Sequence, residues 1–241
     1  MRRTMYGLAV GAAMIAVGLG GRVNMSSAAG EKAKAGTHAE YPLDSLTGLR
    51  AVNAKADIAM HQGRRALHLL QSLGGATLDA SGESMAILTG VEFKDGTIEV
   101  DIAGQPQAGA TPDIRGFIGI AFRVRDKGER FECFYLRMTN GRADEQLRRN
   151  HSVQYISAPD FPWQRLRKEN PGEYESYVDL EPGAWTKMKI AVAGTKARLY
   201  VNGAEQPCLV VNDLKLGETS GQVAVWIGDQ TEGYFSNLRM N

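Results

Sequence analysis

The sequence has almost no excess of charge of either sign. Its 241 residues include 28 Lys and Arg against 27 Asp and Glu, which gives a formal net charge of +1. This balance excludes a basic nucleic-acid-binding arm and an acidic disordered tail. The glycines follow no three-residue period and no apolar heptad persists, so collagen-like and coiled-coil chains are excluded as well. With 43% hydrophobic residues, the chain is long enough for one ordinary globular domain or at most two small ones.

Cysteines and patterns of metal ligands are also scarce. Cys133 and Cys208 are the only thiols, and the sequence leaves open whether they form a disulfide in an oxidising compartment. No histidine stands beside either cysteine, which argues against a catalytic thiol. No His/Cys spacing matches a zinc site and no acidic loop matches a calcium site. We therefore expect no cofactor and leave metal binding, including a structural calcium ion, undecided.

The N-terminus has the organisation of a secretory signal peptide. Arg2 and Arg3 precede an uncharged stretch over 4–21, and small residues follow at 26–29. This order is typical of the n-region, h-region and cleavage site of an export signal. The stretch is rich in Gly and Ala and falls short of the ~20 strongly apolar residues that a membrane anchor needs. We predict a signal peptide over 1–29, a flexible leader over 30–50, and a periplasmic or secreted domain without a stable membrane anchor.

Cleavage of this signal changes the charge of the mature chain. Residues 1–29 contain three arginines and no acidic residue, so their removal lowers the formal net charge from +1 to −2. A near-neutral exported domain has no electrostatic basis for binding nucleic acid. We expect no nucleic-acid partner.

From residue 55 onward, short β-prone runs alternate with turn residues at the spacing typical of an all-β sandwich. The pattern is clearest over 97–102, 117–125 and 131–138, where every second side chain is apolar. We expect these three strands to share one sheet, with one face in the core and the other displaying acids, arginines and an aromatic residue. Roughly ten to twelve strands should form one antiparallel β-sandwich, which is within the usual size of such domains.

The order of these runs resembles the concanavalin A-like, or laminin G-like, jelly-roll superfamily. The runs that carry the resemblance are DIAMHQGRRALHL, FKDGTIEVDI, GFIGIAFRVRD, FECFYLRM, WTKMKIAVAGTKARLYVNG, GQVAVWIG and YFSNLRM. Within that superfamily the chain is most similar to the bacterial exported domains grouped as 3-keto-disaccharide hydrolases, relatives of family 16 glycoside hydrolases. The resemblance implies a concanavalin A-like jelly roll over 51–241 and a saccharide or glycoside ligand.

The sequence of the expected strand that contains Glu99 and Asp101 indicates whether the chain has the catalytic residues of family 16. Enzymes of that family carry Glu-x-Asp-x-x-Glu or Glu-x-Asp-x-Glu, and here Glu99 and Asp101 supply only the first two carboxylates. Ala and Gly stand at 103 and 104, where the last Glu should be. A retaining glycosidase needs two carboxyl groups in separate acid and nucleophile roles, so the motif does not support this reaction. The simpler interpretation is that Glu99 and Asp101 are solvated or pair with arginines such as Arg123 across the sheet.

A stretch of about 45 residues, 139–184, separates two of the expected strands and is too long for a hairpin loop. Its aromatic residues and balanced charges indicate a packed loop insertion with internal ion pairs and a short helix over 143–150. Aromatic rings together with planar polar groups are typical of carbohydrate sites. We predict a saccharide site formed by Arg123, Tyr135, Arg137, Asn140, Arg142, Asp144, Gln154 and Trp163, together with His151. For each of these residues a purely structural role is the alternative.

His151 is the only histidine of the insertion and the candidate general acid or base. If the resemblance extends to activity on 3-keto sugars, the ketone acidifies the neighbouring C–H. A base and an oxyanion stabiliser, such as Arg137 or Arg142, are then sufficient. The alternative is a loop histidine held by hydrogen bonds. Three functions remain open: a carbohydrate-binding jelly roll, a 3-keto-sugar hydrolase or lyase that uses His151, and a protein-interaction module like many laminin G domains.

Overall fold

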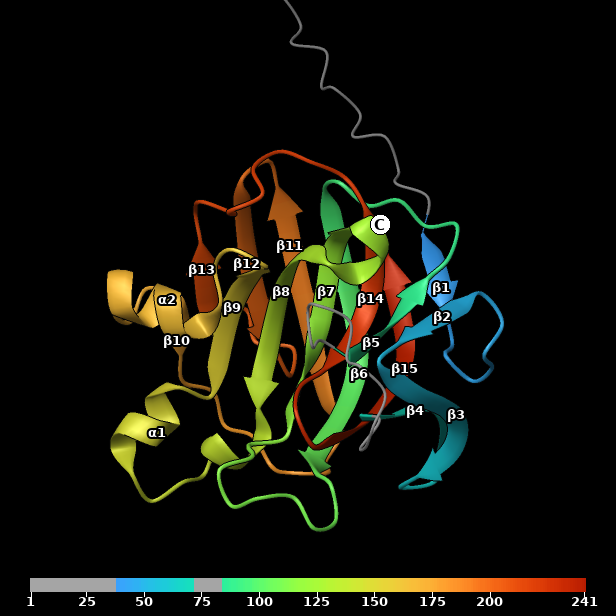
Figure 1. Ribbon diagram of the computed structural model, residues 1–241, viewed down its shortest axis with the longest axis horizontal. Coiled ribbons are helices and arrows are strands. Elements are labelled where there is room, and N and C mark those ends of the chain that lie inside the picture. The colour runs from blue at the N-terminus through green and yellow to red at the C-terminus, as the bar shows by residue number, and fades with distance from the viewer. Residues whose placement is uncertain (1–37, 72–83) are drawn as a thin grey trace, which may run out of the picture. The chain divides into compact units, whose positions relative to one another are not determined.

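The computed structural model describes residues 38–71 and 84–241, and Figure 1 shows them as two β-sheets packed face to face. The predicted signal peptide lies outside the described residues. One sheet contains β1 (Ala39–Tyr41), β3 (Ala54–His61), β4 (Arg64–Gln71), β6 (Gly96–Pro106), β11 (Thr186–Ala193), β12 (Lys196–Val201), β13 (Leu209–Val211) and β15 (Thr231–Met240). The other contains β2 (Leu49–Val52), β5 (Ser84–Leu88), β7 (Phe117–Arg125), β8 (Arg130–Arg137), β9 (Val153–Ala158), β10 (Glu175–Ser176) and β14 (Gln222–Ile227).

Strand order defines the two layers. The eight-stranded sheet runs β13–β12–β11–β6–β15–β4–β3, with β1 pairing to β15, and the seven-stranded sheet runs β10–β9–β8–β7–β14–β5–β2. The helices of the described residues are α1 (Gln146–Asn150) and α2 (Trp163–Glu169), with 3-10 turns η1 (Asp126–Gly128) and η2 (Met138–Asn140). Figure 1 shows α1 and α2 beside the β9 and β10 edge. The predicted all-β, antiparallel sandwich is confirmed.

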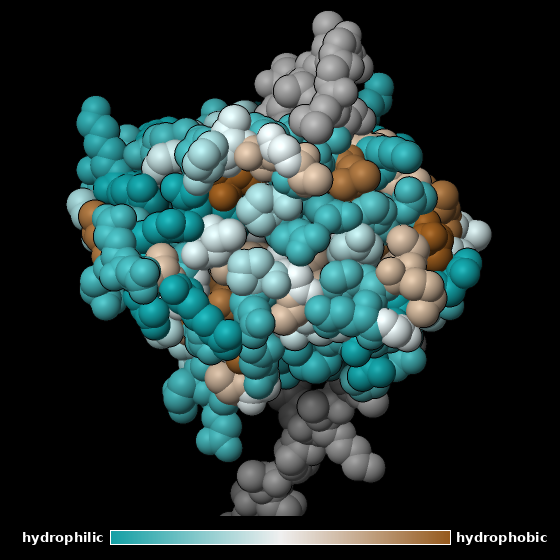
Figure 2. All heavy atoms as spheres, turned by 90° about the horizontal axis from the view of Figure 1, so that it is seen from below, coloured by the Kyte–Doolittle hydropathy of each residue, from teal (hydrophilic) through white to brown (hydrophobic). Residues whose placement is uncertain are grey.

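The core lies between the sheets and follows the predicted alternation. Ile98 and Val100 of β6 are buried while Glu99 between them is half-buried, and Ile118 and Ile120 of β7 are fully buried. Burying one such side chain stabilises the fold by about 1.5–3 kcal/mol. On the described part of the face seen from below, Figure 2 shows mainly hydrophilic residues, with apolar ones in small separate groups. That distribution fits a chain that places its large apolar side chains in the core.

The expectation that β6, β7 and β8 share a sheet is wrong. β7 and β8 are neighbours, with Ile118 opposite Leu136, whereas β6 lies between β11 and β15 in the other sheet. Alternation identifies the apolar face of each strand but not its partner, so it could not separate one sheet from two facing sheets. The outer side of β7 and β8 is not an open polar display either, because Ala121, Cys133 and Tyr135 are buried.

The described chain forms two strands before residue 55, where the first strand was expected. β1 pairs with β15, with Ala39 opposite Met240, and β2 pairs with β5, with Leu49 opposite Leu88. Parts of the predicted flexible leader, 30–50, therefore belong to the sandwich. A three-residue edge strand carries too little periodicity to be recognised, and its pairing partner lies at the other end of the chain.

The insertion over 139–184 continues the sheet instead of forming a loop. Its predicted helix is present as α1, but β9 was not predicted, and it pairs along β8 with Phe134 opposite Tyr155. All six residues of β9 are buried. A strand buried on both faces lacks the alternation of apolar and polar residues that signals a half-exposed one. β10 then pairs with β9 and closes this edge of the sheet.

The two cysteines are not joined by a disulfide. Cys208 is a free thiol whose Sγ donates to the Leu199 carbonyl at 3.5 Å, while Cys133 is buried on β8. Burial raises the pKa of the Cys208 thiol to about 11, so this thiol is protonated at neutral pH. Of the two possibilities left open by the sequence, the structure has the unbonded one.

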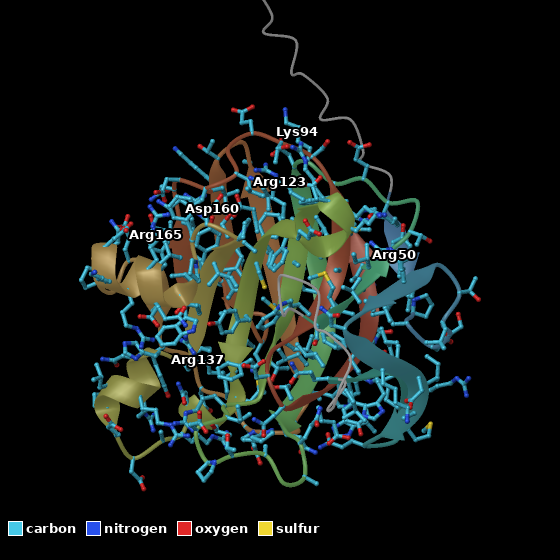
Figure 3. All side chains as sticks on the ribbon, viewed as in Figure 1. Arg50, Lys94, Arg123, Arg137, Asp160 and Arg165 are labelled. Atoms are coloured by element: carbon cyan, nitrogen blue, oxygen red, sulfur yellow. The ribbon has the colours of Figure 1, made fainter. Side chains whose placement is uncertain are left out.

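Arg123 is a buried structural cation and not a ligand residue on an open face. A register shift between Phe122 and Arg125 marks a β-bulge, and Arg123 takes a positive φ of 53° there. Its side chain is fully buried and donates to the carbonyls of Lys94, Gly194 and Gly217 at 2.6–3.2 Å. Figure 3 shows Arg123 near Lys94, well separated from Arg137. Arg123 therefore joins three loops at one end of the sandwich.

We expect Arg123→Met to lower the free energy of unfolding by about 3 kcal/mol or more, because it removes the buried donor of three loop carbonyls and the ion-pair partner of Asp95. Urea unfolding monitored by circular dichroism measures this change. The matched control is Arg198→Met on the exposed side of β12, for which we expect a change within about 0.5 kcal/mol. Equal losses in both variants would contradict the structural role of Arg123.

Candidate functional site

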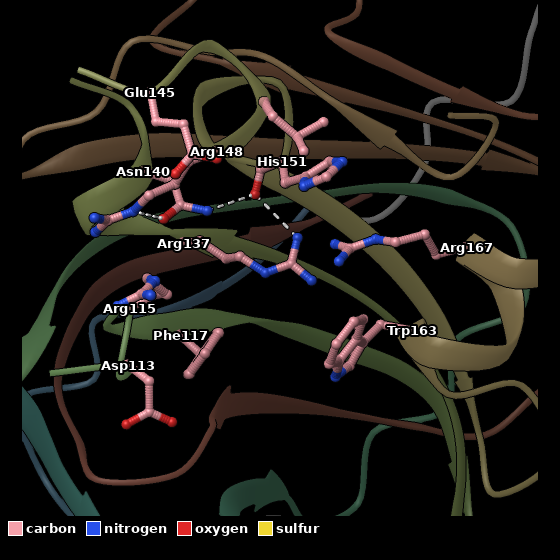
Figure 4. Close-up of a pocket in the computed structure, with 11 residues that line it drawn as sticks. Asp113, Arg115, Phe117, Arg137, Asn140, Glu145, Arg148, His151, Trp163 and Arg167 are labelled. Carbon is pink, nitrogen blue, oxygen red and sulfur yellow. Dashed lines mark hydrogen bonds between the residues drawn. The ribbon is translucent and has the colours of Figure 1, made fainter. Parts of the chain in front are cut away.

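A pocket lies where the ends of β7 and β8 meet the insertion. It has a volume of about 350 Å³ and is called the Arg137 pocket below. Phe117 and Arg137 reach it from the two strands, and residues in and beside η2, α1 and α2 contribute most of the remainder (Figure 4). The lining residues are Asp113, Arg115, Phe117, Arg137, Asn140, Glu145, Leu147, Arg148, His151, Trp163 and Arg167.

Arg137 is the last residue of β8 and is only 5% exposed. Its Nη1 donates to the His151 carbonyl at 2.9 Å and to Glu175 Oε1 at 3.2 Å. Its Nη2 donates to Tyr135 Oη at 3.1 Å and to Gln154 Oε1 at 3.0 Å. Four acceptors thus hold the guanidinium in one orientation, which fixes a positive charge at the pocket.

The register of three strands explains how these partners meet. Tyr135 on β8 lies opposite Gln154 on β9, and Gln154 lies opposite Glu175 on β10. Residues directly opposite one another on adjacent strands share a sheet face, so the three polar side chains form one row. Arg137, two residues after Tyr135, lies on the same face and reaches all of them.

Glu175 is the buried countercharge of this row. Besides Arg137 it accepts from Arg167, whose Nε lies 2.8 Å from Oε2 and whose Nη2 contacts Oε1. Burial alone would raise the pKa of Glu175, but the Arg167 hydrogen bond and the charges of Arg137 and Arg167 lower it below its usual value. The carboxylate is therefore ionised at neutral pH, and one anion is shared by two arginines.

His151 follows α1 and lines the pocket. Its carbonyl accepts from Arg137 and from Asn140 Nδ2, the latter at 3.1 Å, and its Nε2 lies 3.6 Å from Glu175 Oε2. Burial and the positive charges of Arg167 and Arg137 lower the pKa of His151, against the opposite effect of Glu175. The imidazole is therefore neutral at neutral pH and able to accept a proton.

Trp163 and Phe117 supply the aromatic part of the lining. Trp163 is 37% exposed, and the guanidinium groups of Arg167 and Arg137 lie 4.6 and 5.7 Å from its ring centroid. Such cation–π contacts hold an otherwise exposed ring in place. An aromatic ring beside fixed polar groups is the combination that favours the apolar face of a pyranose.

The structure brings together six of the nine predicted site residues. Arg137, Asn140, His151 and Trp163 line the pocket, and Tyr135 and Gln154 are buried behind it as partners of Arg137. The prediction of the saccharide site itself stays a prediction. What the structure adds is that most of these residues form one connected group.

Three predicted residues are not in this group. Arg123 belongs to the far end of the sandwich, as described above. Arg142 is exposed and pairs with Asp179 at 2.9 Å and Glu181 at 2.8 Å, so it is not available as an oxyanion stabiliser in the pocket. Asp144 is exposed and does not line the pocket. Arg142 and Asp144 both lie exposed near the start of the insertion, before α1.

Glu99 and Asp101 are structural residues of the other sheet. Glu99 pairs with Lys189 at 3.1 Å, and Asp101 accepts from Arg64 at 2.8 Å and Lys187 at 2.9 Å. The interpretation that they are salt-bridged is correct in kind but wrong in partner, because β6 and β7 lie in different sheets. Neither carboxylate lines the Arg137 pocket.

Several residues in and beside the pocket are not among the site residues predicted from the sequence. Arg148, Arg167 and Glu175 belong to the balanced charges of the insertion, and Arg115 and Phe117 have no predicted role. The balance of acidic and basic residues in the insertion was the one signal for these residues. A packed segment with equal numbers of both must form specific ion pairs. Which charges pair depends on the unpredicted strands β9 and β10.

No three His, Cys, Asp or Glu side chains in the described part of the chain come together as they would around a metal ion. No helix within 38–71 and 84–241 is long and apolar enough to cross a membrane.

Comparison with solved structures defines the class of fold. The carbohydrate binding module CBM66 from Bacillus subtilis matches with a TM-score of 0.54 at 14% identity, over 81% of this chain and 96% of that one. A protein of unknown function with a galectin-like fold from Bacillus subtilis matches with a TM-score of 0.55 at 13% identity, over 84% and 94%. A native glycosidic hydrolase matches with a TM-score of 0.51 at 10% identity, over 85% and 95%. These likenesses confirm the concanavalin A-like jelly roll.

The family follows from the sequence match. Residues 51–241 match the 3-keto-alpha-glucoside-1,2-lyase-like domain, so the chain belongs to that family, and the resemblance seen in the sequence is confirmed. No curated protein matches the chain.

We expect Glu175→Gln to lower the free energy of unfolding by about 3–5 kcal/mol, because it leaves the buried Arg137 without a countercharge. Since the pKa of Glu175 is lowered by folding, its contribution is present above the unfolded-state pKa and is lost as the pH falls through the folded-state pKa. Urea unfolding at neutral and acid pH measures both effects. The control is Glu169→Gln in the exposed Arg165–Glu169 pair of α2, where about 0.5 kcal/mol is expected. A Glu175 variant as stable as this control would contradict the role of Glu175 as the countercharge of Arg137.

Proposed function

We propose that this protein binds a 3-keto-α-glucoside in the Arg137 pocket and cleaves it by elimination, with His151 as the base. The observation that carries the proposal is the state of His151: a neutral imidazole lines a pocket in which two arginines supply positive charge. Membership of the 3-keto-alpha-glucoside-1,2-lyase-like family supports the choice of substrate.

The reaction needs one base and stabilisation of one negative charge. The C3 ketone acidifies the proton on C2, which His151 removes, and the C–H electron pair forms an enolate across C2 and C3. When the C3 carbonyl forms again, the C1–C2 double bond forms and the bond between C1 and the glycosidic oxygen breaks. The leaving oxygen takes a proton from the imidazolium or from water, so an unsaturated keto sugar and an alcohol are released.

Arg167 is the better candidate for the enolate oxygen than the residues named from the sequence. Arg137 already donates from both Nη atoms to four acceptors, so its main contribution is a fixed positive charge. Arg167 uses Nε and Nη2 for Glu175, and its Nη1 has no acceptor among the described residues. A preorganised donor at the developing charge is the largest single contribution in many enzymes.

Binding without turnover is the second candidate function. Trp163 and Phe117 favour it, because an aromatic platform beside fixed polar groups binds a sugar without any proton transfer. A protein-interaction module is less well supported, since the site is hollow and the face in Figure 2 has only small apolar groups. The export signal expected over 1–29 supports action in the periplasm or outside the cell, which we also propose.

We expect His151→Ala to lower kcat/KM for a 3-keto-α-glucoside by at least about 10²-fold, while the folded state and the binding of the unoxidised glucoside are retained. Product release and thermal shift measure the two properties. His38→Ala is the control, because His38 is exposed and does not line the pocket. Undiminished turnover in a folded His151→Ala would sink the role of the base, and a thermal shift without product in the unmodified protein would leave the binding function.

The pH profile gives an independent prediction. The neutral imidazole is the base, so kcat/KM should stay constant through neutrality and fall only in acid, below the usual histidine range, because the pKa of His151 is lowered. Arg167→Gln removes one cause of that lowering and should move the acid limb to higher pH. Arg165→Gln, on the same helix but paired with Glu169, should leave the limb in place. An acid limb that does not move in Arg167→Gln would contradict this account.

A further inference from the structure

Two arginines in the pocket have no role in the proposed reaction. Arg115 precedes β7 and Arg148 lies in α1, and both line the Arg137 pocket. Figure 4 shows them on the side of the pocket opposite Trp163 and Arg167. They are called the Arg115–Arg148 pair below.

The hydrogen bonds of this pair go to neutral acceptors. Arg148 donates from Nε to Asn140 Oδ1 at 2.9 Å and from Nη2 to Thr139 Oγ1 at 3.0 Å. Arg115 donates from Nη1 to the Pro112 carbonyl at 2.6 Å. These bonds orient both side chains without neutralising them. Nε and Nη2 of Arg115 and Nη1 of Arg148 have no acceptor within the part of the chain that the structure describes.

Most neighbouring arginines, unlike Arg115 and Arg148, form an ion pair with a carboxylate. Arg137 and Arg167 share Glu175, Arg142 binds Asp179 and Glu181, and Arg165 binds Glu169. No ion pair among residues 38–71 and 84–241 includes Arg115 or Arg148. The nearby carboxylates, Asp113 and Glu145, are on the exposed rim of the pocket, where water screens their charge.

Two guanidinium groups that form no ion pair with the described residues lie close enough to affect each other. Burial and the like charges of Arg148 and Arg137 lower the pKa of Arg115, and the charges of Asp113 and Glu145 oppose this effect without cancelling it. Holding like charges together in a half-buried place opposes folding unless an anion binds between or beside them. An arrangement of this kind is expected where the anion is a ligand.

We propose that the Arg137 pocket selects saccharides that carry a negatively charged group, which Arg115 and Arg148 bind together. A carboxylate, a sulfate ester and a phosphate ester share the required chemistry, because each offers several oxygens to a planar guanidinium fork. The inference rests on the proposed function for the position of the sugar ring, near Trp163. The charged group then lies at the other side of the pocket.

The test compares neutral and charged forms of one sugar by calorimetry. The probes are methyl α-D-glucopyranoside, its 6-carboxylate (the glucuronide), its 6-sulfate and its 6-phosphate. We expect at least one charged form to bind about tenfold more tightly than the neutral form at low ionic strength, and this advantage to shrink as salt is added. The three charged arms distinguish which anion the pair prefers.

Substitutions test whether the preference for charged sugars depends on Arg115 and Arg148. Arg115→Gln with Arg148→Gln should abolish the preference, so that neutral and charged sugars bind with equal affinity, while Arg148→Lys should retain part of the preference because the charge remains. Arg149→Gln is the matched control, since Arg149 is the next residue of α1, donates to Tyr177 and does not line the pocket. Thermal melts confirm that each variant is folded.

Equal affinity for neutral and charged sugars, a preference that survives the double substitution, or binding of no charged sugar each overturns the proposal. These outcomes do not decide whether the proposed function is correct. Turnover of a neutral 3-keto-α-glucoside that depends on His151 can be present whether or not charged sugars are preferred. Charge preference in binding can likewise be present in a protein that releases no product.

Discussion

The buried ion pair between Arg137 and Glu175 is the interaction on which the rest of the site depends. Both side chains are removed from water, at 6% and 3% exposure, and a buried charge is tolerated only with a partner and full hydrogen bonding. The pair joins the end of β8 to β10 across β9, so it connects the insertion to the sheet. Through its bond to the His151 carbonyl, Arg137 also holds the segment that carries the candidate base. The same ion pair therefore fixes both the insertion against the sheet and the arrangement of the pocket.

The same pair sets the electrostatics of the pocket. Glu175 is shared between Arg137 and Arg167, so one negative charge faces two positive ones. Burial is the main cause that lowers the pKa of His151 and keeps its imidazole neutral, and the charges of Arg167 and Arg137 add to it against the effect of Glu175. Positive charge is also what the enolate of the proposed reaction needs nearby. A hydrolase of the family 16 type would instead need a pair of carboxyl groups at the sugar. Here Glu99 and Asp101 hold strands of the opposite sheet together and take no part in the pocket.

The fold by itself does not choose between binding and catalysis. The same jelly roll occurs in a carbohydrate binding module and in a glycosidic hydrolase, each at 14% identity or less. In this chain the insertion over 139–184 adds β9 and β10 to the sheet and carries α1 and α2. Four arginines and a neutral histidine line the pocket. This set of groups restricts the possible ligands and reactions more than the fold does.

The sequence by itself determined the strands with clear alternation, their core-facing sides and the region in which the Arg137 pocket lies, because period-two burial and chain adjacency are local properties. Arg137, Asn140, His151 and Trp163 were found for that reason: they lie at the end of one strand and in the segment that follows it. Only the tertiary structure decided which strands are neighbours, and with them which charges meet. One bulge moved Arg123 out of the predicted face, and the unpredicted pairing of β9 and β10 brought Glu175 to Arg137. Contacts between residues far apart in the chain depend on strand order and register, which no local pattern encodes.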